Sequence, residues 1–397
     1  MAEIYLAWRL MMSKLVPKLR FKEFSGEWDK KPINKILTIG SGRDYKHLSD
    51  GNIPVYGTGG YMLSVNDYLY DGESVCVGRK GTIDKPMFLT GKFWTVDTLF
   101  YTHSFKDNIP KFIYALFLKI NWYKYNEASG VPSLSKITIG KIDIYIPTPK
   151  EQQKIANTLS SLDNLIEAQQ RKVEALQKHK KGLMQQLFPS EGANEPKLRF
   201  KEFSGEWEEK KLGDICKVAK SGGTPTSTKS NYYNGTIPFL SIGDMTEQGK
   251  YLTNTTKTIT QEGLDNSSSW IVPINTIIYS MYASVGFVSI NKIPLATSQA
   301  VINLVIKDNI NIEYIYYFLV NYKKYIHKLI ETGTQGNLNA KSVKSIKVLL
   351  PILKEQQKIA NTLSSLDSLI EAYQRKVEAL KKHKKGLMQQ MFVSGED

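Results

Sequence analysis

Two long stretches of the chain place apolar residues at alternating steps of three and four positions. Residues 151–188 and 355–392 each keep this spacing for more than four heptads, which is the pattern of a coiled-coil helix. We therefore expect a central helix over 149–188 and a C-terminal helix over 351–392. An amphipathic helix packed on a globular core is the alternative, but about 32 residues at about 1.5 Å each would form a rod of roughly 48 Å.

The apolar residues of this spacing are called the seam below. The seam of the first helix consists of Ile155, Leu159, Leu162, Ile166, Val173, Leu176, Leu183 and Leu187. The seam of the second consists of Ile359, Leu363, Leu366, Ile370, Tyr373, Val377, Leu380, Leu387 and Met391. Because the two seams are nearly identical, we expect the two helices to pair with each other.

The helices belong to a larger internal duplication. Residues 17–28 and 196–207 both read PKLRFKEFSGEW, and the stretches 151–188 and 355–392 differ at only four pairs of positions. The sequences between these repeated phrases diverge almost completely. This layout indicates a fixed frame that carries two exchangeable modules, whereas a solenoid would need several short repeats that stack on one another.

The repeats predict the order of the domains. The predicted order is an N-terminal extension (1–16), a first variable module (17–148), the central helix (149–188), a linker (189–196), a second variable module (197–350), the C-terminal helix (351–392) and a tail (393–397).

The length of the linker favours an antiparallel helix pair. The nine residue-to-residue steps from Phe188 to Lys197 reach at most about 30 Å, so the second module must begin near the far end of the first helix. A parallel pair would require that module to extend over roughly 48 Å, although a compact domain of its size has a radius of gyration of about 15 Å. We expect an arrangement with pseudo-two-fold symmetry.

The variable modules have the pattern of mixed α+β domains. Short runs of β-branched and aromatic residues, such as SVCVG in the first module and TIIYS in the second, alternate with glycines and predict strands. Each module then has a stretch with helical spacing, a glycine-containing loop and an alternating strand. The fold class is therefore α+β, with two strand-rich modules of one fold separated by the antiparallel coiled-coil helices.

Composition adds a preference for nucleic acid. Lys and Arg number 53 against 38 Asp and Glu, a formal charge of +15, which suits phosphate binding. A basic surface without a partner, or an anionic membrane surface, would also be compatible with this charge. Cys76 and Cys216 are too few for a disulfide framework or a structural zinc site, so we expect a reducing cytoplasm.

The N-terminus has an unusual apolar stretch, MAEIYLAWRLMM. It contains Arg9 and is too short to span a membrane, and no small-residue cleavage pattern follows it. We do not expect a signal peptide. A translation start at Met11 or Met12 would explain the stretch equally well.

Catalytic signatures are missing from the sequence. The glycine clusters at residues 57–62 and 221–230 lack the spacing of a phosphate-binding loop, and no HExxH or CxxC pattern occurs. We therefore expect a non-catalytic chain without a metal or cofactor of its own.

Loops in both modules carry basic, hydroxyl and amide side chains that suit DNA. Arg can bind guanine through two hydrogen bonds, Asn or Gln can bind adenine, and Ser, Thr and Lys can hold phosphates. An exposed loop side chain without a ligand is the alternative for each residue. The candidates for DNA binding are Arg43, Tyr45, Lys46, Arg79, Lys80, Lys85, Thr224, Thr226, Ser227, Lys229, Tyr279, Tyr282, Gln299, Gln335 and Asn337.

Together these features resemble the specificity subunit of a type I restriction-modification system. The resemblance covers essentially the whole chain. It is carried by L-R-F-x-x-F-x-G-x-W at Leu19–Trp28 and Leu198–Trp207, and by P-x-x-x-E-Q-Q-K-I-A at Pro147–Ala156 and Pro351–Ala360. The N-terminal stretch is the clearest departure from the family pattern.

The resemblance implies a function within a larger complex. Each variable module would be a target recognition domain that reads one half of a bipartite, asymmetric site in double-stranded DNA. The helices would fix the spacer and dock two modification subunits, which carry S-adenosylmethionine and methylate adenine. Restriction subunits that use ATP and Mg²⁺ to cleave DNA would join through them.

Two other classes of protein remain open from the residues alone. A coiled-coil adaptor would share the helices without needing basic loops, and it would not bind DNA in a salt-dependent manner. A fused nuclease or methyltransferase would need catalytic carboxylates or a cofactor motif.

Overall fold

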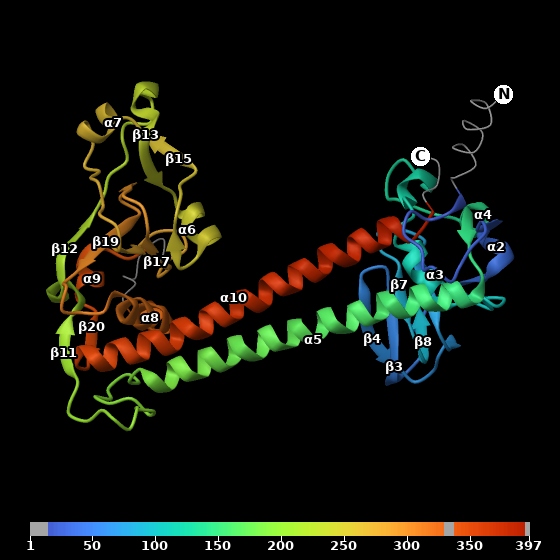
Figure 1. Ribbon diagram of the computed structural model, residues 1–397, viewed down its shortest axis with the longest axis horizontal. Coiled ribbons are helices and arrows are strands. Elements are labelled where there is room, and N and C mark those ends of the chain that lie inside the picture. Colours follow the sequence, from blue (N-terminus) through green and yellow to red (C-terminus); the bar gives the residue numbers. More distant parts are fainter. Residues whose placement is uncertain (1–14, 329–336, 394–397) are drawn as a thin grey trace. The chain divides into compact units, whose positions relative to one another are not determined.

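The computed structural model describes residues 15–328 and 337–393, and the chain divides into two compact units (Figure 1). Unit 1 comprises residues 1–171 and 374–397, and unit 2 comprises residues 172–373. The division falls within the two long helices, so each unit contains one strand-rich domain and one half of each helix. Most of the predicted N-terminal extension lies outside the described residues.

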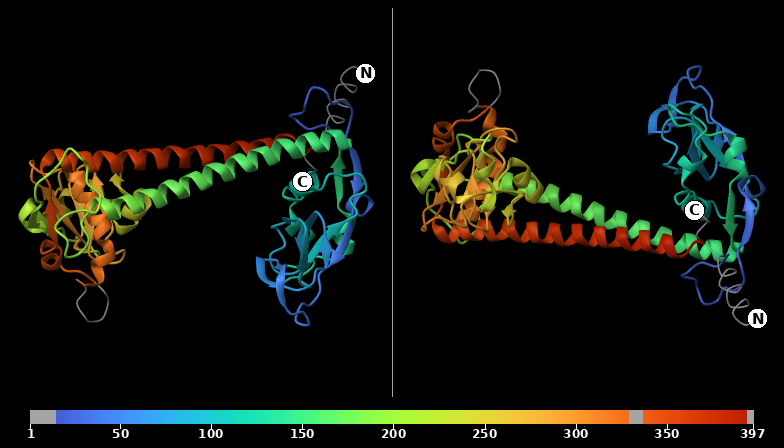
Figure 2. Two further views of the ribbon diagram at one scale, coloured as in Figure 1. Left: turned by 90° about the horizontal axis from the view of Figure 1, so that it is seen from below. Right: turned by 90° about the horizontal axis from the view of Figure 1, so that it is seen from above.

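The two long helices are α5 (Pro149–Leu187) and α10 (Leu353–Gln390). In unit 1, the first half of α5 packs on the last half of α10, because Ile155 and Met391 share one core cluster and Lys384 Nζ lies 2.5 Å from Asp163 Oδ1 (Figure 2). Residue numbers rise along one helix as they fall along the other. The helix halves are therefore antiparallel, as predicted.

Unit 2 repeats this arrangement with the opposite halves. Leu187 and Ile359 share a core cluster, and Lys180 forms an ion pair with Asp367. The helix halves are antiparallel here as well.

Every predicted seam residue is buried or half-buried. Buried Phe188 and Phe392, just beyond the two helices, extend the apolar contact into the strand-rich domains. Phe392 packs between Trp28 and Phe112 in unit 1, with ring centroids 6.2 and 5.2 Å away. These contacts fix each domain on its helix end.

The described residues of unit 1 form two four-stranded sheets and a two-stranded ribbon. The ribbon pairs β1 (Asp29–Pro32) with β10 (Asp143–Ile146). The first sheet has the order β2-β9-β6-β7, which are Thr38–Ser41, Leu99–His103, Ser74–Gly78 and Met87–Leu89. The second has the order β4-β3-β8-β5, which are Gly60–Val65, Asp50–Gly57, Lys92–Thr95 and Tyr70–Asp71. Its helical segments are α2 (Ile33–Ile36), α3 (Pro110–Phe117), η2 (Trp122–Tyr125) and α4 (Lys136–Lys141).

In unit 2, residues 172–328 and 337–373 form a five-stranded sheet, a three-stranded sheet and a ribbon. The ribbon pairs β11 (Glu208–Lys211) with β20 (Lys347–Leu350). The larger sheet has the order β12-β19-β16-β17-β14, which are Cys216–Ser221, Val301–Ile306, Ile277–Ser280, Val288–Asn291 and Tyr251–Leu252. The smaller has the order β15-β13-β18, which are Lys257–Ile259, Tyr233–Leu240 and Ala296–Thr297. Its helical segments are η3 (Leu212–Ile215), η4 (Ser230–Tyr232), α6 (Ile242–Gln248), α7 (Gln261–Asp265), α8 (Ile312–Tyr322), η5 (Lys323–Lys328) and α9 (Ala340–Lys344).

The two domains follow the same chain order. The sheet order β2-β9-β6-β7 in unit 1 has its counterpart in β12-β19-β16-β17 in unit 2, and each sheet is followed by a helix, a short helix and the closing ribbon strand. The prediction that both modules share one fold is thus consistent with the strand orders.

The alternating strand predicted at the end of each module is preceded by a short helix within the same segment. The alternating sequence at 136–141 forms α4, because the Ser135 hydroxyl accepts a hydrogen bond from the Thr138 amide and caps the helix. Asn339 caps α9 in the same way. A local capping bond overrides the β propensity of the alternating residues.

Candidate nucleic-acid interface

Three loops of unit 1 meet beside the first sheet, and we call them the first loop edge. They are Gly42–Arg43 after β2, Arg79–Lys80 after β6, and Asp97–Thr98 before β9. The Arg43 amide donates to the Thr95 carbonyl at 2.8 Å, and the Arg79 amide donates to the Thr98 carbonyl at 2.7 Å. Backbone bonds therefore hold two arginines on neighbouring loops.

The close approach at Gly42 leaves no space for a side chain. A Cβ on Gly42 would lie 1.9 Å from the Val96 carbonyl oxygen, and this oxygen belongs to the backbone. The backbone of the next residue, Arg43, is held at its amide by the Thr95 carbonyl. It is also held at its carbonyl, to which Trp94 Nε1 donates at 2.8 Å. The Arg43 side chain itself is exposed.

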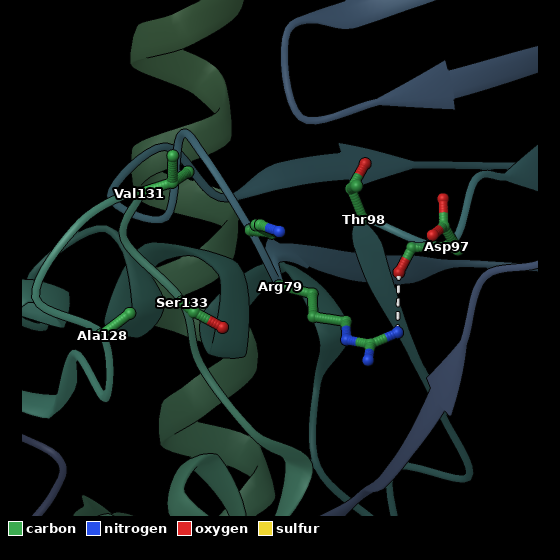
Figure 3. Close-up of a pocket in the computed structure, with 7 residues that line it drawn as sticks. Arg79, Asp97, Thr98, Ala128, Val131 and Ser133 are labelled. Atoms are coloured by element: carbon green, nitrogen blue, oxygen red, sulfur yellow. Dashed lines mark hydrogen bonds between the residues drawn. The ribbon is translucent and has the colours of Figure 1, made fainter.

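Arg79 and Lys80 line a cavity of about 540 Å³. The remaining lining residues are Asp97, Thr98, Ala128, Val131 and Ser133. Figure 3 shows the Arg79 guanidinium reaching the Asp97 carbonyl, to which it donates at 3.3 Å. The volume lies within the range of about 300–1,000 Å³ that is usual for ligand sites, and the lining offers both donors and acceptors.

Unit 2 has an equivalent second loop edge with different side chains. Its loops are Gly222–Thr224 after β12, Met281–Tyr282 after β16, and Gln299–Ala300 before β19. The Met281 amide donates to the Ala300 carbonyl at 2.9 Å, as the Arg79 amide does to Thr98 in unit 1.

The side chains of the second loop edge also contact one another. The Thr224 hydroxyl donates to Gln299 Oε1 at 2.8 Å. Tyr282 is 42% exposed. The second loop edge thus presents a hydroxyl, an amide and a phenol where the first presents guanidinium and ammonium groups.

The other candidates differ in their exposure. Lys46, Lys85, Thr226, Ser227 and Lys229 are exposed, and Asn337 is half-buried. Lys229 Nζ donates to the Tyr232 hydroxyl at 2.9 Å, and this bond raises the pKa of Lys229. Tyr45 is half-buried against the cluster around Trp94. Gln335 lies outside the described residues.

The prediction that Tyr279 binds DNA is wrong. Its side chain is completely buried in the core cluster of unit 2, where β16 points it inward. Burial raises the pKa of its hydroxyl. Tyr279 therefore cannot contact DNA directly in this conformation; Tyr282, two residues after β16, is the exposed tyrosine.

Sequence reasoning missed residues that the fold brings to the cavity. Thr98 and Ser133 lie 35 positions apart in sequence. An antiparallel β-bridge between Lys80 and Ser133 places Ser133 beside the first loop edge. No local motif marks such a pairing. Ser133 follows a glycine-containing loop, and only long-range strand pairing gives that loop a place at the site.

A second missed feature is a buried ion pair in each unit. Arg20 Nε and Nη2 each lie 2.8 Å from an oxygen of Glu151, and Arg199 binds Glu355 at 2.8 and 2.9 Å. Hydrogen bonding to Glu355 raises the pKa of Arg199. Each partner belongs to a repeated phrase, so the duplication itself could have identified the pairs.

A glutamine in each helix phrase completes the attachment of the domain. Gln152 Oε1 accepts from the Ile109 amide at 2.9 Å, and Gln152 Nε2 donates to the Pro147 carbonyl at 2.9 Å. Gln356 forms the same bonds with the Asn311 amide and the Pro351 carbonyl. We refer to the ion pair and this glutamine together as the clamp of each unit.

The described residues offer little to nucleophilic or metal chemistry. Burial raises the pKa of the Cys76 and Cys216 thiols to about 12, so neither is an activated nucleophile. Among residues 15–328 and 337–393, no cluster of three or more His, Cys, Asp or Glu could hold a metal ion. Within the same ranges, no helix is both long and apolar enough to cross a membrane.

Comparisons with known proteins agree on one family. The model of the type I restriction modification DNA specificity domain matches the chain twice, at residues 25–178 and 204–382. The MjaIX specificity subunit of Methanocaldococcus jannaschii, from a type I restriction enzyme, is 32% identical over 194 residues, which are 48% of this chain and 45% of that protein.

Two further relatives extend over more of the chain. The MjaVIII specificity subunit from the same organism is 28% identical over 348 residues, 82% of this chain and 78% of that protein. The solved S subunit of a type I restriction-modification system from M. genitalium covers 96% of this chain and 100% of its own, with a TM-score of 0.64 and 18% identity. At that identity the likeness concerns the fold.

Proposed function

This chain belongs to the type I restriction-modification DNA specificity family, whose members are generally non-catalytic, and on that premise we propose that it selects the DNA sequence for a larger complex. Each strand-rich domain reads one half of a bipartite, asymmetric site in double-stranded DNA. The helix pair fixes the spacer between the half-sites and docks the catalytic subunits.

The observation that carries this proposal is the pair of equivalent loop edges with unlike side chains. The same backbone bonds hold Arg79 in one unit and Met281 in the other. A shared frame with different side chains is what two readers of two different half-sites require. A single reader, or a protein that recognises only the phosphate backbone, would not need this difference.

The first loop edge suits a guanine-containing half-site. A guanidinium can donate two hydrogen bonds to the O6 and N7 atoms of guanine, and Lys80 can hold a phosphate. The amide of Gln299 in the second loop edge suits adenine. Water and DNA shape contribute to such reading.

The surfaces of the helices support docking of two equal partners. A seam needs only its apolar residues, yet the exposed residues of the two helix phrases are also almost the same. Gln153 and Gln357 are both exposed, as are Asn157 and Asn361. Two modification subunits bind these equal surfaces, and restriction subunits join through them. S-adenosylmethionine, ATP and Mg²⁺ belong to these partners.

The helix pair sets the length of the spacer between the two half-sites. Insertion of one heptad at the same level in both helices should lengthen the unspecified spacer and leave both half-sites unaltered. A changed half-site with an unchanged spacer would contradict the spacing role of the helices.

The principal experiment is co-expression of this chain with its modification subunit, followed by mapping of N6-methyladenine across the host DNA. A bipartite motif with a fixed gap is expected. A stable complex that binds DNA without methylating it would contradict the proposal and leave a DNA-binding adaptor.

A further inference from the structure

The two units differ where the strand-rich domain meets the helix pair. Gln152 binds the amide of Ile109 just before α3, and Gln356 binds the amide of Asn311 just before α8. The two domain helices can therefore be compared position by position. Lys111 corresponds to Glu313, and Ala115 corresponds to Tyr317.

In unit 2 this place is filled by a network of polar side chains. The Tyr317 hydroxyl donates to Asp367 Oδ2 at 2.5 Å and accepts from Lys250 Nζ at 2.9 Å. Lys250 Nζ also lies 3.1 Å from Glu313 Oε2. The Lys250 side chain is only 11% exposed, so the network is largely removed from solvent.

In unit 1 the corresponding place is a cavity of about 190 Å³. Ala115 has no phenol to donate to Asp163, the counterpart of Asp367. The Asp163 side chain is 50% exposed, compared with 21% for Asp367. The lining residues are Phe88, Lys111, Tyr114, Ala115, Leu118, Ala156, Leu159, Ser160, Asp163, Asn164, Lys384 and Met388. We call this cavity the unit 1 hollow.

The charges of the hollow also differ from those of unit 2. Unit 2 has two cations, Lys180 and Lys250, and two anions, Glu313 and Asp367. The hollow has Asp163 with Lys384, and Lys111 in place of the glutamate. Lys111 forms no ion pair with any residue in the described part of the chain, so the hollow has one uncompensated positive charge.

We propose that the unit 1 hollow receives a tyrosine side chain of a modification subunit, with a neighbouring acidic side chain of that subunit paired to Lys111. The phenol occupies the space that Tyr317 fills in unit 2, and its hydroxyl donates to Asp163. This inference rests on the proposed docking of modification subunits.

The shape and lining of the hollow favour this occupant over others. Its volume is below the range of about 300–1,000 Å³ that is usual for small-molecule sites. The Asp163 carboxylate disfavours a phosphate group. The apolar walls, from Tyr114, Leu118 and Met388, suit an aromatic ring, and aromatic anchors in such pockets often dominate protein interfaces.

The two docking surfaces are therefore unequal although their helices are nearly identical. The copy of the modification subunit that binds unit 1 gains an anchor, whereas unit 2 supplies the equivalent phenol from its own chain. The two copies should bind with different affinities, and the copy on unit 1 should be the tighter.

Two substitutions test the proposal in the full chain. Ala115→Tyr fills the hollow with the phenol that unit 2 already has, and Lys111→Glu reverses the exposed charge. Each should weaken one of the two partner sites by about tenfold or more and leave the other unchanged. Titration calorimetry with the purified modification subunit, together with native mass spectrometry, measures both affinities and stoichiometry.

Lys124→Glu is the matched control, because Lys124 is exposed in the same domain but does not line the hollow. It changes the net charge equally and should leave both affinities unaltered. Thermal unfolding of the free chain checks that Ala115→Tyr is folded, and exposed Lys111 supplies a second variant whose folding is not in question.

The outcomes separate this inference from the proposed function. If the unmodified chain binds two copies and both variants bind them equally well, the hollow is no docking site, and the specificity function still stands. If the unmodified chain binds no modification subunit, the proposed docking fails and the inference fails with it. Equal loss with Lys124→Glu would attribute the effect to net charge and overturn the inference.

Discussion

The first and second loop edges are held by equivalent backbone hydrogen bonds, but they differ in almost every side chain that they expose. Arg43, Arg79 and Lys80 on the first correspond in place to neutral Gly223, Met281 and Tyr282 on the second. The bonds that the two loop edges have in common use only backbone amides and carbonyls. The comparison teaches that strand ends set the frame of each loop edge, so that its side chains can change without loss of the fold.

The largest effect is expected from breaking the clamp of one unit. Arg20→Ala leaves the Glu151 carboxylate, which is 1% exposed, without its partner, and removal of one member of a buried pair costs about 3–5 kcal/mol. Urea denaturation should reveal this loss, and hydrogen exchange should locate it in unit 1. Arg199→Ala should have the same effect in unit 2.

A matched control distinguishes a buried pair from an exposed one. Lys154→Ala removes the ion pair with Glu23, whose side chains are about half exposed, and should leave stability essentially unchanged. Equal destabilisation by Arg20→Ala and Lys154→Ala would contradict the assigned role of the clamp.

A smaller loss of folding stability is expected from Gly42→Ala. The added Cβ would meet the Val96 carbonyl oxygen at 1.9 Å, so the loop must shift, at a cost of about 1–3 kcal/mol. Binding to the half-site read by unit 1 should weaken as well. Gly59→Ala has open space around its Cβ and should change the free energy of unfolding by less than about 0.5 kcal/mol.

Substitution of Arg79 should affect recognition more than stability. Arg79→Ala should reduce the binding free energy for DNA with the preferred base by about 1–3 kcal/mol and relax the base preference at one position of one half-site. Selection from a randomised DNA library would measure this change. Lys80→Ala should instead weaken binding to all DNA sequences similarly and reduce the slope of log K against log salt concentration by about one. A relaxed base preference in the Lys80 variant would reverse the roles of the two residues.

The smallest effect is expected on the second loop edge. Gln299→Ala removes an exposed amide and its hydrogen bond to Thr224. A loss of about 1 kcal/mol in DNA-binding free energy is therefore expected. The same library selection should find one relaxed position in the other half-site, and none in the half-site that depends on Arg79. Relaxation of both half-sites by one substitution would contradict independent reading by the two domains.

Features that repeat along the chain were predictable from the sequence. The heptads identified both helices, and the length of the linker predicted their antiparallel direction, because each depends on spacing within a short stretch. The loops with Arg43 and Arg79 were also identified, since glycines and basic residues follow short strands. These inferences need no knowledge of which strands pair.

Features that depend on long-range pairing were not predictable. Tyr279 and Tyr282 lie three positions apart, and only the place of β16 inside its sheet decides that the first is buried. The contact of Ser133 with the loop of Lys80 depends on the same kind of pairing. The helix α4 was missed for a local reason, because one serine hydroxyl outweighs an alternating pattern.

The clamp has a consequence for how such a protein can evolve. Its glutamine binds the amide of Ile109 and the carbonyl of Pro147, and every residue presents a carbonyl and almost every residue an amide. The attachment therefore makes few demands on the side chains of the domain that it holds. Under the proposed function, exchange of a gene segment for one strand-rich domain between the repeated phrases would give a new DNA target in a single recombination event, without prior adaptation of the helices.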